Sequence, residues 1–248
     1  MKHVVAISGG KDSVAMALRL QEVQPLEKFI YLITPVGNEP PAMFKHWDNL
    51  EHLLGAKLMR LAPFKGDGLV EVIRQQKMIP NFRARFCTRI LKIQPTVQWL
   101  TENAPCVQYV GLRADEEERK GIYGDMQGVE QKYPMREWGW GIDEVWGYLD
   151  RRGVEIPERT DCAWCFFQRL IEWKRLWQQH PQIYQAAVDL EKEIGGTFRS
   201  PGRDTWPASL ESLRDEFKKG RRVRGEQNYD QKKLFDCDRE ALCRVCSM

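Results

Sequence analysis

A glycine-rich hexapeptide near the start of the chain carries the groups that an anion-binding loop requires. Residues 8–13 read S-G-G-K-D-S, which combines adjacent glycines with a lysine, an aspartate and two hydroxyl groups. Glycines allow backbone N–H groups to approach an anion closely, and the lysine and hydroxyls add further donors. The common phosphate-binding loop reads G-x-x-x-x-G-K-[ST], whereas here Lys11 directly follows the glycine pair and precedes Asp12. An ordinary strand-to-helix turn is the alternative, but the complete hexapeptide favours a phosphate site of another type.

The cysteines form a second group of candidate chemical residues. The chain has seven, and two C-x2-C pairs occur, at Cys162–Cys165 and at Cys243–Cys246. Without an export signal, this number of cysteines indicates metal or redox chemistry and not a disulfide framework. The two pairs are compatible with a four-thiolate zinc site, although they are much further apart than in a compact zinc ribbon. Cys106 stands alone and is expected to be a small buried apolar residue.

Apolar runs alternate with helical periodicity in the first half of the chain, which predicts βαβ units. Apolar residues between Val14 and Leu18 have helical spacing and predict a helix directly after the hexapeptide. Strands are predicted at residues 3–7, 29–33, 57–61 and 107–112. Such a pattern is typical of an α/β fold, a parallel sheet with helices on both faces, whose ligands bind beyond the carboxyl ends of the strands. Three segments follow strands and are expected to line one cleft: 8–13, 34–39 and 113–118.

The second half of the chain is rich in tryptophan and has mainly helical periodicity. Helices are predicted from Leu170, from Pro181 to Gly195, and from Pro207. Most of the tryptophans are expected to fill the core between these helices. We therefore predict a nucleotide-binding α/β domain at 1–132 and a mainly helical extension at 133–248, which carries a C-x2-C pair and a cysteine-rich tail.

The composition is that of a soluble globular protein. The chain has 248 residues, of which 42% are hydrophobic and 29% are charged. No apolar run reaches the roughly 18 residues that a membrane span requires, and the N-terminal residues lack the apolar stretch of a signal peptide. A cytoplasmic location without a membrane partner is therefore expected. The net charge of +3 does not by itself indicate a nucleic-acid partner.

Five segments of the sequence resemble one protein family. The hexapeptide resembles the pyrophosphate loop of the PP-loop ATP pyrophosphatases, which implies a fold of the HUP/PP-loop type. Four further segments resemble the phosphoadenosine phosphosulfate reductase-like branch of that superfamily: 85–95 (R-F-C-T-R-I-L-K-I-Q-P), 111–119 (G-L-R-A-D-E-E-E-R), 133–140 (Y-P-M-R-E-W-G-W) and 159–165 (R-T-D-C-A-W-C). The resemblance extends over roughly residues 1–200.

The resemblance implies an adenine nucleotide and more than one activity. True phosphosulfate reductases tend to carry a degraded loop, because their nucleotide lacks the β and γ phosphates of ATP. An intact loop implies an ATP-dependent adenylating enzyme that releases pyrophosphate and prepares an acceptor for sulfur transfer. Similar proteins act on DNA or tRNA, so a nucleic-acid acceptor and a sulfur donor protein are expected partners. Two alternatives stay open: a sulfonucleotide reductase with a tail cysteine as its nucleophile, and a non-catalytic ATP-binding regulatory subunit.

The resemblance also implies roles for individual residues. The nucleotide-binding residues are expected to be Ser8, Gly9, Gly10, Lys11, Asp12, Ser13 and Lys92. Lys11, Asp12 and Arg113 are expected to act in catalysis, with Asp12 holding Mg²⁺ or fixing the loop. Glu39 is expected to approach the ribose. For the run 115–118 with Arg119, in contrast, the residues themselves predict only an exposed helix start, since acids favour the first turn.

The cysteine pattern implies a [4Fe–4S] cluster, with zinc as the alternative. Cys87, Cys162 and Cys165 match the positions of the iron–sulfur members of the family. Those members often have two adjacent cysteines where this chain has Cys87 followed by Thr88. Either a tail cysteine, Cys243, supplies the fourth ligand, or one iron stays open and is able to hold a sulfide.

A basic stretch near the end of the chain suggests contact with nucleic-acid backbone. Residues 218–225 read K-K-G-R-R-V-R-G and contain no acid. Such a patch contacts phosphates without recognising sequence. A solvated loop after a helix is the alternative, since the C-terminal end of a helix attracts cations.

Overall fold

The core of the molecule is a five-stranded, fully parallel sheet. The computed structural model describes residues 1–64, 66–119, 121 and 125–226. The strands lie in the order β3-β2-β1-β4-β5, and each neighbouring pair is parallel. Their bounds are β1 Lys2–Ala6, β2 Phe29–Ile33, β3 Leu58–Arg60, β4 Cys106–Tyr109 and β5 Val129–Lys132. The four strands predicted from apolar runs are thus present, and the predicted α/β fold is confirmed.

The strand order places a topological switch point between β1 and β4. From β1 the chain builds outward to β2 and β3, and it then returns to add β4 and β5 on the other side of β1. Ligands of open parallel sheets bind at such a point, beyond the carboxyl ends of the strands. The loops after β1 and β4 therefore border the expected cleft.

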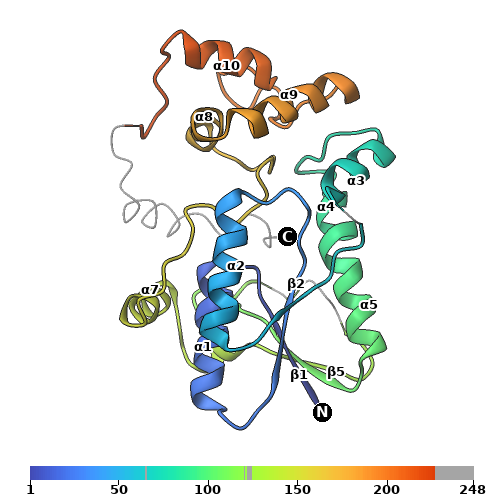
Figure 1. Cartoon of the computed structure of the whole chain (residues 1–248), viewed down its shortest axis with the longest axis vertical. Helices are drawn as coiled ribbons and strands as arrows, with labels where there is room; N and C mark the ends of the chain where they lie inside the picture. The colour runs from blue at the N-terminus through green and yellow to red at the C-terminus, as the bar shows by residue number, and fades with distance from the viewer. Residues whose placement is uncertain (65, 120, 122–124, 227–248) are drawn as a thin grey trace.

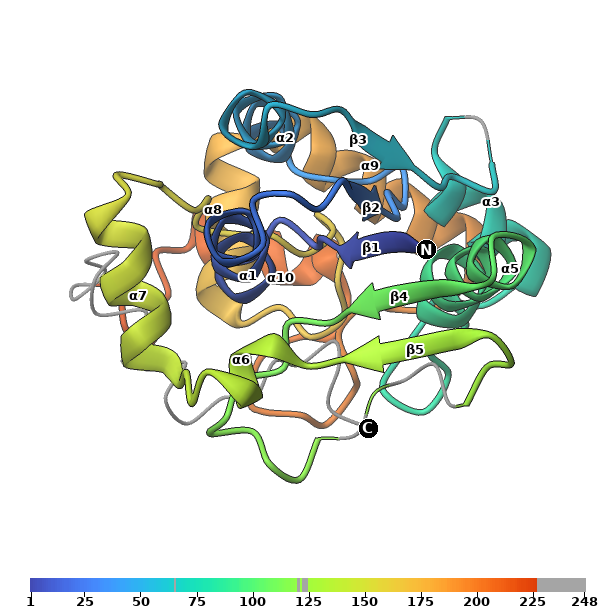
Figure 2. The same cartoon turned by 90° about the horizontal axis from the view of Figure 1, so that it is seen from below.

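Helices cover both faces of the sheet (Figure 2). α1 (Lys11–Val23), α2 (Pro41–Leu54) and α7 (Ile142–Arg151) lie on one face, and α3 (Gly68–Gln76) and α5 (Gln94–Glu102) lie on the other. Side chains alternate along each strand, so Val5 packs with α1 and α2 whereas Val4 packs beside Leu100 of α5. A short helix, α4 (Phe86–Thr88), and a π-helical turn, Arg89–Ile93, precede α5. No helix within the described ranges is long and apolar enough to cross a bilayer.

β5 is the strand that apolar patterning does not predict. Its sequence, V-E-Q-K, is polar, and it occupies the edge of the sheet, where polar and charged side chains are common. The short helix α6 (Pro134–Glu137) follows it directly.

A second core joins the helical extension to the α/β part. α8 (Leu170–Gln179), α9 (Pro181–Ile194) and α10 (Leu210–Lys218) lie beyond the carboxyl ends of the strands (Figure 1). Trp173 is fully buried there and belongs to the same hydrophobic cluster as Val72 of α3 and Phe86 of α4. The buried tryptophans of the extension fill this core, as expected. α7, in contrast, packs against α1 in the first core, so the boundary at 132/133 stays a prediction.

Candidate functional site

Two serines hold the glycine-rich loop between β1 and α1 in shape. The backbone N–H of Ser8 donates to Ser13 Oγ at 3.1 Å, and Ser13 Oγ donates to the carbonyl oxygen of Gly10 at 3.0 Å. The N–H of Gly10 donates to Ser8 Oγ at 3.2 Å. The two hydroxyls, predicted to face a phosphate, thus also brace the loop internally.

The first turn of α1 presents unpartnered backbone N–H groups. Gly10 is the N-cap and has no side chain to satisfy them. Among the described residues, the N–H groups of Lys11, Asp12 and Ser13 have no acceptor. Free N–H groups at the positive end of a helix form an anion site. The amino group of Lys11 adds a formal positive charge at the same place.

His46 of α2 fixes the carbonyl group of Gly9. His46 Nε2 lies 2.9 Å from Gly9 O, so this nitrogen carries the proton and donates. His46 is buried, and burial lowers its pKa, which keeps the ring neutral. Gly9 has φ +84°, and a Cβ at this position would lie 2.6 Å from Met43 Cε, so only glycine fits without strain. Sequence analysis missed His46 because it lies in a distant helix.

An ion pair joins the first turn of α1 to the loop after β4. Arg113 NH1 lies 3.2 Å from Asp12 Oδ2, and Lys11 Nζ lies 3.6 Å from the same oxygen. Burial raises the pKa of Asp12, while the two cations act in the opposite direction. Gly111 permits the close approach, since a Cβ there would lie 3.3 Å from the backbone nitrogen of Ser13. The predicted catalytic residues therefore meet at the switch point.

The acidic run after Arg113 is exposed at Asp115, Glu117 and Glu118, as expected, but it forms a turn and does not start a helix, so that part of the prediction is wrong. Glu116 is only 3% exposed, and Arg119 NH1 lies 2.6 Å from its carboxylate. Arg136 NH2 donates to the carbonyl oxygens of Glu116 and Arg119. These arginines compensate the buried acid and hold the segment as a turn.

The segment that carries the C-x2-C pair lies beside the glycine-rich loop. A Cβ at Gly10 would lie 3.5 Å from Thr160 Oγ1, two residues before Cys162. The N–H of Ala163 donates to the carbonyl oxygen of Asn38, in the loop after β2, at 2.7 Å. Loops after β1 and β2 thus position the thiols of Cys162 and Cys165 close to the proposed phosphate site.

The three described cysteines of the predicted metal site influence one another. Interaction with the neighbouring thiol, together with burial, raises the pKa of Cys162, and the same interaction lowers the pKa of Cys165. Burial, followed by the charge of Cys165, raises the pKa of Cys87. Within the described ranges, however, no group of three or more His, Cys, Asp or Glu side chains converges as a metal site. Cys243 lies outside these ranges. Cys106, expected to be buried, is 0% exposed.

Lys92 is within electrostatic reach of the thiols and of the loop after β2. Burial raises the pKa values of Cys87 and Glu39, interaction with Cys165 and burial raise that of Cys162, and the charge of Lys92 opposes the shift in all three. It belongs to the π-helical turn, a distortion often found at functional sites. Glu39, expected near a ribose, accepts hydrogen bonds from the N–H groups of Val36 and Gly37 at 2.5 and 3.0 Å. Its carboxylate therefore braces its own loop.

Part of the basic stretch 218–225 is compensated by acid. Lys219 Nζ and Arg221 NH1 lie 2.8 and 3.2 Å from the Glu216 carboxylate. The Arg221 guanidinium also stacks on Trp206 at 4.0 Å from the ring centroid. These contacts are typical of a solvated helix end, the alternative to a phosphate-binding patch.

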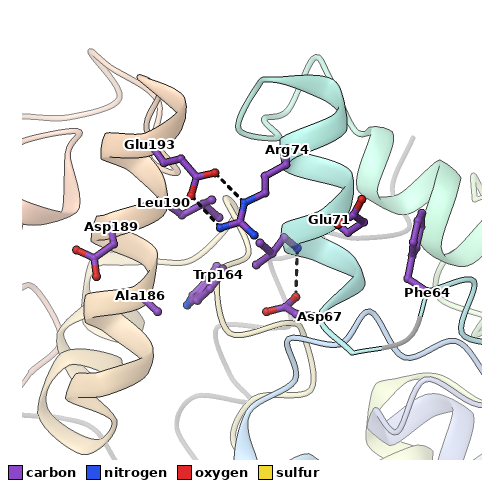
Figure 3. A pocket seen from close by; sticks show the side chains of 10 residues that line it. Phe64, Asp67, Glu71, Arg74, Trp164, Ala186, Asp189, Leu190 and Glu193 are labelled. Atoms are coloured by element: carbon purple, nitrogen blue, oxygen red, sulfur yellow. Dashed lines mark hydrogen bonds and ion pairs between the residues drawn. The ribbon is translucent and has the colours of Figure 1, made fainter.

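A groove of about 670 Å³ lies away from the glycine-rich loop, between α3 and α9. Arg74 and Glu193 pair across it, and Trp164 contributes to its wall (Figure 3). No residue of 8–13 lines this groove. The anion-binding groups described above lie at the start of α1 and not in this groove.

Comparison with known proteins identifies the family. The family model for the phosphoadenosine phosphosulfate reductase domain matches residues 2–161, more than half of the chain. No curated protein matches the sequence. Among solved structures, the U34-tRNA thiolase NcsA from Methanococcus maripaludis, with its [4Fe–4S] cluster, is 16% identical with a TM-score of 0.46, covering 100% of this chain and 80% of that chain.

A second solved structure is a predicted subunit of tRNA methyltransferase from Methanocaldococcus jannaschii. It is 16% identical with a TM-score of 0.34, covering 62% of this chain and 90% of that chain. Likenesses this distant carry no argument about function, whereas the family model covers β1 to β5 and the segment before Cys162. The chain therefore belongs to the phosphoadenosine phosphosulfate reductase domain family.

Proposed function

We propose that the protein is an ATP-dependent adenylating enzyme that acts in sulfur transfer. The unpartnered N–H groups at the start of α1, beside Lys11 in an intact S-G-G-K-D-S loop, support this most directly. These donors suit an anion with several charges, such as pyrophosphate. Pyrophosphate is the leaving group of an AMP-forming reaction. The family assignment agrees with an adenine nucleotide as ligand.

The proposed reaction has two steps. An acceptor oxygen attacks the α-phosphorus of ATP, the bond from that phosphorus to the bridging oxygen breaks, and pyrophosphate leaves. A sulfur nucleophile from a donor protein then displaces AMP, which carries away the acceptor oxygen. Lys11 and the free N–H groups would neutralise the charge that builds up on pyrophosphate. Arg113, held by Asp12, would position the loop after β4 at the same place.

Asp12 would supply an oxygen ligand of the kind that Mg²⁺ prefers. Mg²⁺ would neutralise phosphate charge there. Lys11 and Arg113 both lie beside the same Asp12 oxygen. Burial raises the pKa of Asp12, so a bound Mg²⁺ would favour the ionised carboxylate just as Arg113 does.

Cys87, Cys162 and Cys165 would hold a metal centre together with Cys243 from the tail. The donor set is soft sulfur, which suits a [4Fe–4S] cluster or zinc. The mutual effect of Cys162 and Cys165 on their pKa values supports a site that uses both sulfurs. Burial raises the pKa of Cys87, and the charge of Lys92 acts in the opposite direction. With Cys243 as the fourth ligand every iron of a [4Fe–4S] cluster would be covered, whereas a cluster held by Cys87, Cys162 and Cys165 alone would have one open iron able to bind sulfide.

A sulfonucleotide reductase is the second candidate, because the matching family model is named for that activity. Calorimetric titration with ATP and Mg²⁺, and separately with adenosine phosphosulfate, distinguishes the two. We expect ATP to bind, and an Asp12→Ala variant to lose turnover while Asp48→Ala, an exposed acid of α2, retains it. Tight binding of adenosine phosphosulfate without any binding of ATP would favour the reductase.

The acceptor is tested by measuring pyrophosphate and AMP with tRNA, single-stranded DNA and duplex DNA in turn. We expect AMP and pyrophosphate, not ADP and phosphate, with one of these nucleic acids and a sulfur donor protein. ATP binding without pyrophosphate release in every mixture would indicate a regulatory subunit instead.

A further inference from the structure

The segment between α3 and α5 is basic and free of acid. No Asp or Glu occurs between Glu71 and Glu102. The cations of this stretch are Lys77, Arg83, Arg85, Arg89 and Lys92, together with Arg74 of α3, which pairs with Glu193. The net charge of the whole chain, +3, hides this local excess. The same segment contains Cys87, so the excess positive charge lies at the proposed site of sulfur transfer.

A tight turn at the tip of this segment displays an aromatic ring and a cation. Asn81 Oδ1 accepts hydrogen bonds from the N–H groups of Arg83 and Ala84, both at 3.0 Å. The turn fixes Phe82, which is 48% exposed although it is large and apolar. The Arg83 guanidinium lies over the Phe82 ring, 5.2 Å from its centroid. Ring and cation therefore form one surface.

A second arginine and aromatic pair continues this surface toward the cysteines. The Arg85 guanidinium lies 5.6 Å from the ring centroid of Phe167, which follows Cys165 by two residues. Arg89 is exposed and lies one helical turn beyond Arg85, since its N–H donates to Arg85 O. Cys87 lies between these two arginines in the sequence.

Arg83 and Arg89 are not compensated by acid. Within the described residues neither forms an ion pair; in the basic stretch near the end of the chain Arg221 pairs with Glu216, whereas Arg222 and Arg224 are likewise without an ion pair but have no exposed aromatic ring stacked beside them. An exposed cation without an acidic neighbour retains its full charge for an external anion. An exposed ring stacks with any unpaired nucleobase, a contact that binds single strands without sequence preference.

We propose that Phe82, Arg83 and Arg89 bind a single-stranded nucleic acid, with a base on the Phe82 ring and phosphates on the two arginines. The inference rests on the proposed function, because the strand would be the acceptor for sulfur. It assigns strand binding to the tip between α3 and α4, and not to residues 218–225. A duplex is disfavoured, since its bases are paired and stacked and are not free to meet the ring.

Binding is measured on the full chain, without ATP, by fluorescence anisotropy of labelled oligo(dT), oligo(U) and a duplex. We expect the single strands to bind at about 50 mM salt and the affinity to fall steeply by about 200 mM. Arg83→Ala/Arg89→Ala should weaken binding at least about tenfold and reduce the slope of log K against log salt by about 1.4, or about 0.7 for each phosphate contact. Phe82→Ala should cost about tenfold at either salt concentration.

Two controls make the test specific. Arg151→Ala removes an exposed arginine of α7, on the opposite side of the sheet from α4 (Figure 1), and should not change binding. Arg222→Ala/Arg224→Ala removes two cations of the stretch 218–225 and should also leave binding unchanged. Any of three results would overturn the inference: a loss of strand binding confined to Arg222→Ala/Arg224→Ala, equal binding of the duplex, or no strand binding at low salt.

ATP titration of the same samples separates this inference from the proposed function. ATP binding without strand binding would remove the nucleic-acid surface and leave adenylation standing. The opposite result is also informative. If the unchanged protein binds the strand but not ATP, and Arg83→Ala/Arg89→Ala abolishes strand binding, the nucleic-acid surface would be supported and adenylation would be removed. Oligo(dT) against oligo(U) then shows whether the strand is DNA or RNA.

Discussion

Arg113 and Asp12 face each other across the switch point of the sheet, with 3.2 Å between NH1 and Oδ2. The Arg113 side chain is 9% exposed and also contacts Asp115 at 2.8 Å. One guanidinium thus joins the loop after β4 to the helix whose N-terminus is the proposed phosphate site. The Asp12 carboxylate is itself largely buried, so water has little access to either partner of this ion pair.

Arg113→Ala should lower the free energy of unfolding by about 3 kcal/mol, because it removes the closest cation from the largely buried Asp12 carboxylate and leaves only Lys11, at 3.6 Å, beside it. Urea unfolding followed by circular dichroism measures this. Arg19→Ala is the matched control, since the pair of Arg19 with Glu22 is substantially exposed and should contribute less than about 1 kcal/mol. Equal losses for the two variants would show that the Asp12–Arg113 contact does not stabilise the fold.

His46→Ala should weaken ATP binding, because Gly9 loses the donor that fixes its carbonyl group. The loss of a buried hydrogen bond, which corresponds to about 1–3 kcal/mol, falls on the loop that presents the N–H groups. Calorimetric titration with ATP measures it. His46→Gln, which retains an N–H donor, should recover part of the affinity. If His46→Ala binds ATP like the unchanged protein, His46 only fills space.

Glu191 should make stability depend on pH. Burial raises its pKa to about 7, although the N–H groups of Phe198 and Leu210 donate to its carboxylate. The folded protein therefore holds a proton between about pH 4.5 and 7 that the unfolded chain has released. The free energy of unfolding contributed by Glu191 is present below this range and falls by about 3 kcal/mol as the pH rises through it.

Urea unfolding of the unchanged protein and of Glu191→Gln across this pH range tests the assignment. The difference between the two curves should change with pH in that direction, because glutamine does not titrate. Glu193→Gln, an exposed neighbour paired with Arg74, is the control and should not reproduce the trend. A pH-independent difference for Glu191→Gln would contradict the raised pKa.

Anaerobically purified protein should be brown and contain iron and acid-labile sulfide. Cys162→Ser should lose both, because it removes one sulfur of the Cys162–Cys165 pair. Cys106→Ala is the matched control, since Cys106 is buried in a separate core beside α5 and should leave the metal content unchanged. Colourless protein with stoichiometric zinc would select the alternative metal.

A variant that lacks residues 237–248 tests the fourth ligand. Loss of iron would support Cys243 as the fourth ligand, because the deleted residues would then be needed to complete the metal site. Retention of iron would show that three protein ligands suffice and that one iron is open.

The sequence predicts the features that depend on local pattern, and misses those that depend on distant partners. The hexapeptide at residues 8–13 and four apolar strands are visible as continuous runs. β5 is not, because an edge strand needs no apolar run. His46 is equally invisible, since its importance arises from Gly9, which only the packing of α2 against the loop brings near.

Charged residues show the same difference between what local pattern predicts and what depends on distant partners. Glu116 seemed to belong to an exposed acidic run because the sequence cannot show that Arg113 and Arg119 enclose it. The absence of acid between Glu71 and Glu102 is readable from sequence alone. Only the structure shows that the Asn81 turn exposes Phe82 and Arg83 together.

The second hydrophobic core limits how the two halves of the molecule can move. Trp173 and Phe198 of the extension share this core with Val72 of α3, so a hinge opening between the halves would bring large apolar surfaces into water. Cys162 packs against this core, so separating the two halves would also disturb the segment that carries the thiol pair. On the proposed function, the substrate would therefore have to move to the thiols, because a movement of the halves would expose apolar surface.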